Sequence, residues 1–426
     1  MSKKKIHLSR RGFLKTAAAA GAALAAPHVV SSSVLGKDGA VAPSEKITLG
    51  AMGIGGRGGY DLGCILREDD VQVVAVCDVR GPNRKRAKAM VDGRYGNENC
   101  TAYIDFREMF ARKDIDAVLI ATGNNWHGLA SILAAKAGKD VYSEKPCTRN
   151  IVESLELADT FQRTGRVYQG GMQRRNLPHF QYCIELAQRG KLGKLVTLHA
   201  HGGGHGTGMS EYGAGNEQEP PREEVAWDLY LGPAAWRPYS KRFITGHFDK
   251  GGGMVGGGVQ EWGSHCVDLC QWANSADRTF PVEYEPTSDG ASCRYANGVK
   301  LIIRDGGWMN SGSCPVRYEG ETGWVETGDS GDIFASSQGL LAGRGAKQGG
   351  YPADSHIRDF FNCVKTRGLP KANHFVACNT HIACHAAGIS LFLGRKVTLD
   401  PVKIEFVADE EANRLRTEAI REPWRI

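Results

Sequence analysis

A glycine-rich turn between an apolar strand and a helical segment constrains the fold of this chain more than any other feature. Residues 46–52 read as a buried strand, residues 53–58 spell Gly-Ile-Gly-Gly-Arg-Gly, and a helix pattern follows over 60–67. In this G-x-G-x-x-G pattern the first glycine permits a tight turn, the second lets the backbone approach a pyrophosphate, and the third lets the helix pack on the strand. The N–H groups at the start of the helix can donate to phosphates. The pattern predicts a parallel α/β domain that binds a dinucleotide.

An acidic residue at the end of the next strand indicates which dinucleotide. The apolar strand over 71–77 ends at Asp78, twenty residues after Gly58. A carboxylate at this point accepts hydrogen bonds from the ribose hydroxyls and repels a 2′-phosphate, so the sequence favours NAD(H) over NADP(H). Arg80 lies close enough in sequence to soften that preference.

Strands and helices alternate through the next hundred residues. Strands are predicted over 115–122 and 140–142, and helices over 126–137 and 151–163. This alternation is typical of a doubly wound parallel sheet, in which ligands bind where the carboxyl ends of the strands gather. Residues 122–127 and 143–146 lie at such ends and are therefore candidate site segments.

The first 26 residues indicate where the protein works. The sequence Ser-Arg-Arg-Gly-Phe-Leu-Lys over 9–15 precedes an alanine-rich run to Ala26. This is a twin-arginine export signal, and the run is too short and too rich in alanine for a spanning helix, which needs ~20 apolar residues. Because this route carries folded proteins, we expect contact with the twin-arginine export machinery, a periplasmic or other extracytoplasmic location, and a cofactor bound before export.

The charge of the chain argues against a nucleic-acid-binding surface. Six basic residues and no acidic residue lie within 1–26, and they account for the whole formal net charge of +6. The remaining chain of about 400 residues, long enough for two domains, is therefore nearly neutral and shows neither a basic patch for nucleic acid nor a polybasic membrane anchor. No run of 18 apolar residues follows the signal, so the mature form is expected to contact no membrane.

Cysteine and histidine spacing gives no support for a metal site. The 12 cysteines are scattered through the chain without a Cys-x-x-Cys pair, and we expect most of them to be small buried residues. His199 with His201, and His381 with His385, have spacings that zinc can use, but neither pair is completed by a carboxylate or cysteine nearby in sequence. No metal is expected.

The segments at the strand ends resemble a known family. Thr122, Trp126 and His127 end one strand, and Glu144-Lys145-Pro146 ends the next. A Rossmann domain with these two segments resembles the glucose–fructose oxidoreductase, inositol dehydrogenase and MocA (Gfo/Idh/MocA) family, over nearly the whole mature chain. The resemblance implies a C-terminal α/β domain with a large open, mostly antiparallel sheet. It also implies that Lys145 reaches the nicotinamide and a substrate hydroxyl.

The same resemblance suggests the domain plan. We expect a signal and linker over 1–43, a Rossmann domain over 44–170, and a substrate and oligomerisation domain over 171–426. The last segment of that domain is expected to return to the Rossmann domain. A homo-oligomer, either a dimer or a tetramer, is expected, with the charged tail over 410–426 as one contact.

A second catalytic segment lies in the C-terminal half. Members of the family usually carry Asp-x-x-x-His on a helix facing the nicotinamide, and here the pair is Glu261 and His265. Side chains four apart share a helix face. Imidazole suits proton transfer because its ordinary pKa of about 6.5 lies near working pH. Glu261 is one methylene longer than the usual aspartate and is expected to reach a different substrate atom. The alternative for His265 is a buried, hydrogen-bonded core histidine.

The expected site residues fall into three groups. The catalytic group is Lys145, His265 and Glu261. The cofactor-binding group is Gly53, Gly55, Gly56, Arg57, Gly58, Asp78, Arg80, Thr122, Asn124, Trp126, His127, Glu144 and Lys145. The substrate-binding group is Lys145, Arg174, His201, Trp236, Glu261 and His265, with His205 as a further pocket residue.

Export narrows the expected function. No obvious pool of free NAD exists outside the cytosol, so a dehydrogenase that released reduced cofactor would stop after one turnover. We therefore expect an NAD(H)-dependent oxidoreductase that acts on a hydroxyl of a sugar, polyol or glycoside and recycles a tightly bound cofactor. Redox-neutral, NAD-dependent glycoside hydrolysis is the alternative. A non-catalytic NAD and sugar sensor is a third possibility, against which the intact pair of Lys145 and His265 argues.

Overall fold

The computed structural model describes residues 42–203, 217–241, 243–244, 257–304, 307–309 and 311–425. The chain divides into two units, residues 1–46 and residues 47–426. Every α-helix and β-strand of the described residues belongs to the second unit. The twin-arginine segment, His205 and the glycine run at 251–253 lie outside the described residues.

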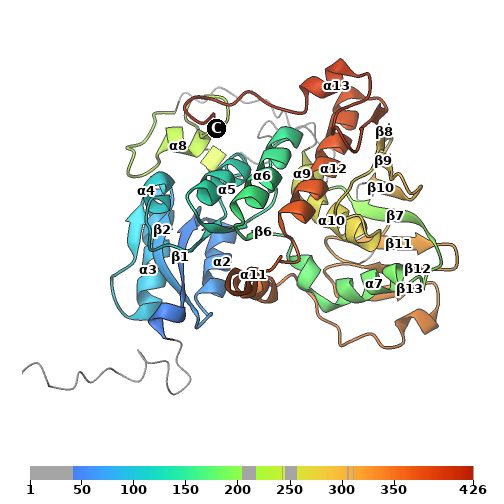
Figure 1. Ribbon diagram of the computed structural model, residues 1–426, viewed down its shortest axis with the longest axis horizontal. Helices are drawn as coiled ribbons and strands as arrows, with labels where there is room; N and C mark the ends of the chain where they lie inside the picture. Colours follow the sequence, from blue (N-terminus) through green and yellow to red (C-terminus); the bar gives the residue numbers. More distant parts are fainter. Residues whose placement is uncertain are drawn as a thin grey trace, which may run out of the picture. The chain divides into compact units, whose positions relative to one another are not determined.

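The first sheet, which contains β1, β2 and β6 in Figure 1, has six parallel strands in the order β3-β2-β1-β4-β5-β6. Its strands are β1 (Ile47–Met52), β2 (Val71–Cys77), β3 (Thr101–Tyr103), β4 (Ala117–Ile120), β5 (Asp140–Ser143) and β6 (Tyr168–Gly170). The helices between them are α2 (Gly56–Ile65), α3 (Gly81–Tyr95), α4 (Phe106–Phe110), α5 (His127–Lys136) and α6 (Ile151–Thr164). The strand order reverses between β1 and β4, the point at which such sheets bind dinucleotides.

The second sheet has eight strands in the order β13-β12-β11-β7-β10-β9-β8-β14. Its strands are β7 (Leu195–His201), β8 (Glu283–Thr287), β9 (Gly290–Arg294), β10 (Lys300–Arg304), β11 (Val316–Gly320), β12 (Trp324–Thr327), β13 (Ile333–Ala335) and β14 (Val397–Thr398). Only β7 and β10 pair in parallel, and the other neighbours are antiparallel. The two sheets confirm the predicted fold, a Rossmann sheet followed by an open, mostly antiparallel one.

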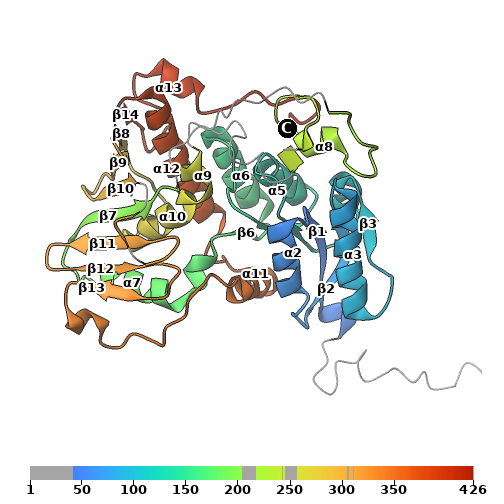
Figure 2. The ribbon, with the colours of Figure 1, turned by 180° about the vertical axis from the view of Figure 1, so that it is seen from behind.

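Helices cover one face of the second sheet. Figure 2 shows α7 (Pro178–Gln188) and α10 (Gly263–Ala273) beside its central strands. Along β7, Leu198 and Ala200 are buried while His199 is partly exposed, because successive side chains of a strand point to opposite faces. The segment predicted to be catalytic lies at the start of α10, which packs on this covered face.

A late segment of the chain packs on the first sheet. Helix α11 (Asp354–Thr366) buries Ile357 and Phe360 in the same core cluster as Leu49 of β1 and Leu119 of β4. The helix thus supplies apolar cover for one face of the Rossmann sheet. This cover accounts for the wholly apolar sequence of β4, whose four residues are all buried.

Helix α12 (His374–Leu393) is long and apolar enough to cross a membrane by length and composition. Polar residues such as Asn379 and His381 interrupt it, so the sequence contains no unbroken apolar run of that length. Most of the helix is buried between α6 and α10 (Figure 1). Its composition is therefore explained by its place in the core of its own chain.

All twelve cysteines are free and buried, which confirms the prediction that they act as small core residues. The closest described contact between two of them joins Sγ of Cys266 and Sγ of Cys314, which lie 3.2 Å apart. Burial raises the pKa of the Cys314 thiol well above its usual range. The thiol is thus held in its neutral form.

The C-terminal tail packs on its own chain, and its expected role as an oligomer contact stays a prediction. Trp424 is only 5% exposed and belongs to the same core cluster as Phe106 and Trp126. Its ring centroid lies 4.7 Å from that of Trp126 in an edge-to-face arrangement. Figure 1 shows the end of the chain beside α8 (Trp227–Leu231). The tail therefore reinforces the edge of the Rossmann sheet.

Candidate active site

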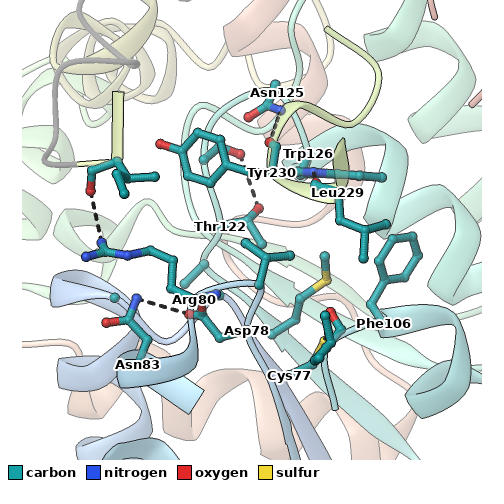
Figure 3. Close-up of a pocket in the computed structure, with 18 of the residues that line it drawn as sticks. Cys77, Asp78, Arg80, Asn83, Phe106, Thr122, Asn125, Trp126, Leu229 and Tyr230 are labelled. Carbon is teal, nitrogen blue, oxygen red and sulfur yellow. Dashed lines mark hydrogen bonds between the residues drawn. The ribbon is translucent and has the colours of Figure 1, made fainter. Parts of the chain in front are cut away.

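A cavity of about 590 Å³ lies at the carboxyl edge of the Rossmann sheet (Figure 3). It is lined by residues from the ends of β1, β2 and β4, from the first turns of α2 and α3, and from α8. Small-molecule sites typically occupy about 300–1,000 Å³. The cavity therefore has the position and the size of a cofactor site.

The glycine turn has the geometry that the sequence predicts. Gly53 has φ +78°, and a Cβ atom there would lie 2.6 Å from the backbone of Thr122. A Cβ at Gly58 would lie 2.2 Å from the carbonyl oxygen of Gly53. By contrast, a Cβ at Gly56 would meet nothing within 4 Å. Two glycines are thus required by packing, while the turn between them stays open to the cavity.

The start of α2 is suited to phosphate. Gly55 is its N-cap residue and offers no side-chain cap to the first N–H groups of the helix. Gly55 and Gly56 both line the cavity. Uncapped N–H groups and the positive end of the helix dipole favour an anion at this point. The residues present therefore fit the pyrophosphate of a dinucleotide.

Asp78 lies at the end of the cavity formed by β2 and α3. Its carboxylate accepts hydrogen bonds from the backbone N–H of Arg80 at 2.8 Å and from Nδ2 of Asn83 at 3.3 Å. Burial raises the pKa of this carboxyl. The guanidinium of Arg80 donates to the carbonyl oxygen of Ile244 at 3.0 Å. Thus the guanidinium of Arg80 is already bonded to a carbonyl, and that of Arg84 donates to the carbonyl oxygen of Asp78 itself at 2.7 Å.

The loop after β4 connects the cavity to the catalytic segments. Thr122 lines the cavity, and Nε2 of His127 lies 3.0 Å from its carbonyl oxygen. Nδ1 of His127 lies 2.9 Å from the carbonyl oxygen of Pro146. His127 therefore contacts the two strand-end segments and holds them together. Trp126 forms part of the cavity wall, and its Nε1 donates to the carbonyl oxygen of Leu229 at 2.7 Å.

Glu144 lies behind the cavity, in a buried polar network. Its Oε1 accepts from Nε of Arg57 at 3.1 Å and from Nε2 of Gln173 at 2.6 Å. Arg57 also pairs with Asp61, whose carboxyl has a pKa raised well above its usual range by burial and by the charge of Glu144. Arg57 lines the cavity, whereas Glu144 does not. Glu144 is therefore placed to orient Arg57 and the start of the Lys145 turn.

Lys145 and His265 are brought together around Trp262. Nζ of Lys145 lies 5.8 Å from the centre of the Trp262 ring, and the His265 ring centroid lies 5.9 Å from it. Arg174 stacks on the same indole at 5.2 Å. Trp262 was not predicted as a site residue from the sequence, although an aromatic residue between Glu261 and His265 was a signal that could have identified it.

His265 is a buried histidine with one ring nitrogen unused. It is 3% exposed, and its Nδ1 has no hydrogen-bond partner among the described residues. Burial, followed by the positive charges of Arg174 and Lys145, lowers its pKa well below the ordinary value of 6.5. The imidazole is therefore neutral, with a nitrogen free to accept a proton. The catalytic role of His265 stays a prediction.

Glu261 contacts the Rossmann domain directly. The helical segment is interrupted at Trp262, so that α9 (Gly258–Glu261) ends before α10 begins. Oε1 of Glu261 accepts a hydrogen bond from Nδ2 of Asn124 at 2.9 Å. Two residues assigned to different groups from the sequence are thus bonded to each other.

The expected substrate residues are distributed unevenly. Arg174 is buried and donates from Nε and Nη2 to the carboxylate of Asp329, at 3.0 and 2.6 Å. His201 lies at the end of β7 and is partly exposed. Trp236 is 64% exposed and does not line the cavity. Arg174 is therefore placed beside Trp262 and Lys145, whereas no contact brings Trp236 to them.

The histidine pair of α12 holds the turn that carries Lys145. Nε2 of His381 accepts a hydrogen bond from the backbone N–H of Cys147 at 3.0 Å, and its Nδ1 lies 2.8 Å from the carbonyl oxygen of Ala377. Burial lowers the pKa of His381 to about 4. His385 lies 3.5 Å from the hydroxyl of Thr148. Within the described ranges, no group of three or more potential metal ligands is gathered.

Comparison with known proteins agrees with this arrangement. Residues 47–172 match the NAD-binding Rossmann fold of an oxidoreductase family, and residues 204–426 match the C-terminal alpha/beta domain of that family. Residues 7–27 match the signal sequence of the twin-arginine translocation pathway. The protein is therefore exported across the membrane, to the periplasm or the extracytoplasmic space.

Curated relatives match over part of their length. A glycosyl hydrolase family 109 protein of Solibacter usitatus is 33% identical over 165 residues, which cover 37% of each chain. A protein of the same description from Stenotrophomonas maltophilia is 30% identical over 239 residues, or 54% of this chain and 48% of that protein. The matched stretches thus span between about a third and a half of these relatives.

Solved structures match over most of the chain. Myo-inositol 2-dehydrogenase of Lactobacillus plantarum aligns with a TM-score of 0.60 and 18% identity, covering 83% of this chain and 100% of that one. Aldose-aldose oxidoreductase of Caulobacter crescentus aligns with a TM-score of 0.59 and 17% identity, over 83% and 100% of the two chains. At these identities the likeness establishes the fold. Together with the two family matches, which include one over more than half of the chain, it shows that the chain belongs to the Gfo/Idh/MocA oxidoreductase family.

Proposed function

We propose that this protein is an NAD(H)-dependent enzyme that oxidises a hydroxyl of a sugar, polyol or glycoside and keeps its cofactor through repeated turnovers. The observation that carries the proposal is the meeting of Lys145 and His265 around Trp262, beside the loops that line the dinucleotide cavity. A neutral imidazole with an unused nitrogen, next to a fixed positive charge, is the pair that proton removal from an alcohol requires.

In this proposal each side chain has a defined task. The turn over 53–58 binds the pyrophosphate, and Asp78 accepts from ribose hydroxyls. The bound nicotinamide supplies hydride exchange at the carbon that carries the reacting hydroxyl. Lys145 donates to the hydroxyl oxygen and stabilises the negative charge that develops on it. Nδ1 of His265 takes the hydroxyl proton.

The environment of His265 suits a proton that must be returned. The positive charges of Arg174 and Lys145 make the protonated imidazole less stable than it would be in water. The residue therefore gives the proton back readily when the hydroxyl is regenerated. A cofactor that is reduced and reoxidised in place needs a reversible base of this kind.

We also propose NAD(H), held tightly, as the cofactor. Asp78 supports this choice because its carboxylate lies where a 2′-phosphate would have to be placed. Export supports tight binding, since a cofactor lost outside the cytosol has no evident replacement. A homo-oligomer remains a prediction, to be tested by the mass of the protein in solution.

Redox-neutral glycoside cleavage is the second candidate, and the family 109 relatives favour it. Oxidation of a ring hydroxyl acidifies the neighbouring C–H, so that the leaving group can be eliminated. Water then adds at the anomeric carbon, and the hydroxyl is regenerated. Lys145 and His265 would act at the oxidised hydroxyl as before, so this reaction requires the same residues and no net oxidant.

One experiment separates the candidates. The native protein, without added cofactor, is incubated with a panel of para-nitrophenyl glycosides and with pairs of free sugars. Release of nitrophenol without net NADH indicates glycoside cleavage, and formation of one oxidised and one reduced sugar indicates oxidoreduction between two substrates. If sugars bind but neither the bound cofactor nor any sugar changes, the enzyme proposal is wrong and a sensor remains.

A further inference from the structure

A segment from the C-terminal half of the chain forms the outer wall of the cofactor cavity. This segment, residues 221–234, contains α8 and is called the strap. Leu229 and Tyr230 of the strap line the cavity opposite Asp78 and Asn83 (Figure 3). The cavity therefore has one wall from the Rossmann sheet and another from a segment about 150 residues later in the chain.

The strap is bonded to the end of β2. The backbone N–H of Ala226 donates to the carbonyl oxygen of Val79 at 2.9 Å, and that of Gly81 donates to the carbonyl oxygen of Glu224 at 2.8 Å. A Cβ at Gly81 would lie 2.4 Å from the carbonyl oxygen of Glu223. The strap thus approaches the backbone beside Asp78 so closely that only glycine fits.

A second attachment joins the strap to the loop after β4. Nδ2 of Asn125 donates to the carbonyl oxygen of Leu231, and Nε1 of Trp126 donates to that of Leu229, both at 2.7 Å. Gly232 has φ +53°, and a Cβ there would lie 2.3 Å from the Trp126 ring. The strap is therefore bonded to both strand ends that flank the cavity.

The C-terminal tail holds the strap from outside. The guanidinium of Arg421 donates to the carbonyl oxygens of Gly232 at 3.0 Å and Asp228 at 2.9 Å, and it pairs with the carboxylate of Asp228. Trp424 packs against Trp126, the residue that bonds the strap from the other side. The strap is thus enclosed between the edge of the sheet and the tail.

We propose that Arg421 and Trp424 are positioning residues that keep the strap closed over bound NAD(H), and that they set the rate at which the dinucleotide dissociates. The proposal rests on NAD(H) being the cofactor of this cavity. Leu229 and Tyr230 form one wall of the cavity, so lifting the strap opens that side for a dinucleotide seated against Asp78. Lifting it breaks the bonds to Arg421, some of which involve a charged group and are stronger than neutral ones.

The test is the release rate of bound NADH. The full-length mature protein is loaded with NADH and diluted into excess NAD⁺, and the loss of nicotinamide fluorescence is followed. Arg421→Ala should accelerate release about tenfold or more, equivalent to about 1.4 kcal/mol. Arg421→Lys keeps the charge beside Asp228 but not the two bonds to carbonyl oxygens. Its NADH release rate should lie between those of Arg421→Ala and the wild type. Arg395→Ala removes an arginine that pairs with Asp409 and Glu411 instead of the strap, and should release NADH at the wild-type rate.

Trp424→Phe and Asp228→Asn keep the inference testable if Arg421→Ala does not fold. Each should accelerate release while the apo-protein melts within a few degrees of the wild type. Wild-type release rates in all folded variants would overturn the role of the strap and tail. If wild-type protein binds no NADH, the proposed cofactor is wrong as well, so the two failures are distinguishable.

Discussion

At the scale of single residues, His265 shows how burial and charge select a protonation state. Its imidazole is enclosed, one nitrogen lacks a described partner, and the nearest charges are positive. Each of these factors favours the neutral form. A histidine in this setting remains a proton acceptor at pH values where an exposed imidazole would already be protonated.

The first prediction concerns that acceptor. His265→Ala should slow the chemical step by about 10²–10⁴-fold, the usual cost of losing a positioned base. Bound NAD(H) should remain, because the cofactor contacts expected at residues 53–58 and Asp78 are intact. Single-turnover rates and cofactor content check both statements. The control is His199→Ala, on strand β7, against which α10 packs. An unchanged rate for His265→Ala would show that another group accepts the hydroxyl proton.

The second prediction concerns cofactor choice. Asp78→Ser should increase the affinity for NADPH relative to NADH by about tenfold, about 1.4 kcal/mol, because a repelling carboxylate is removed. Arg80 will contribute little to this gain, since its guanidinium is already bonded to the carbonyl oxygen of Ile244. Titration of apo-protein with each cofactor measures the ratio. A wild-type preference for NADPH would contradict the role given to Asp78.

At the scale of secondary-structure elements, α9 and the loop after β4 are linked by one side-chain bond. Glu261, one methylene longer than the aspartate usual in the family, accepts a hydrogen bond from Nδ2 of Asn124 at 2.9 Å. This bond connects the C-terminal half to the Rossmann half, and the expectation that Glu261 reaches a different substrate atom stays a prediction.

The third prediction follows from that length. Glu261→Asp should lose the bond to Asn124 and change KM across a panel of sugars, with bound cofactor unaltered. Glu261→Gln keeps an oxygen at the same reach and should perturb KM less. If the glutamine variant, which loses the charge, perturbs KM more than the aspartate variant, which keeps it, then the charge of Glu261 and not the bond to Asn124 matters for substrate binding.

Elements differ in how far the sequence predicts them. The bounds of β2 were predicted without error and those of β1, β5 and α6 to within one residue, because local periodicity and flanking turn residues determine them. The position of α8 was not predicted, since nothing within residues 227–231 shows that they cover a cavity built from β1 and β2. The meeting of Lys145 and His265 was expected only through the family resemblance, because residues 120 apart are related by tertiary packing alone.

At the scale of the whole molecule, several histidines are buried in a form that cannot accept a proton without loss of stability. Burial lowers the pKa values of His356, His374 and His381 from 6.5 to about 4. Above pH 6.5 these histidines are neutral in both the folded and the unfolded chain, so they do not make the free energy of unfolding depend on pH. Between pH 6.5 and about 4 the unfolded chain binds more protons, so folding stability falls as the pH falls.

The fourth prediction isolates one of these groups. His374 stacks on Phe161, and neither of its ring nitrogens has a described hydrogen-bond partner, so His374→Phe should fold. The variant should lose less free energy of unfolding than the wild type between pH 6.5 and 5, by up to about 1.4 kcal/mol per pH unit. Urea unfolding at the two pH values measures the difference. If the wild type and the variant lost the same free energy of unfolding between the two pH values, His374 would not take up a proton on unfolding.

The strap also determines how long a single exported molecule can work. If the dinucleotide cannot be replaced outside the cytosol, each dissociation inactivates one molecule permanently. Activity then decays with a first-order half-life fixed by the slow lifting of residues 221–234, and not by the thermodynamic affinity for NAD(H). The contacts of Arg421 with Gly232 and Asp228 would therefore set how long each exported molecule stays active.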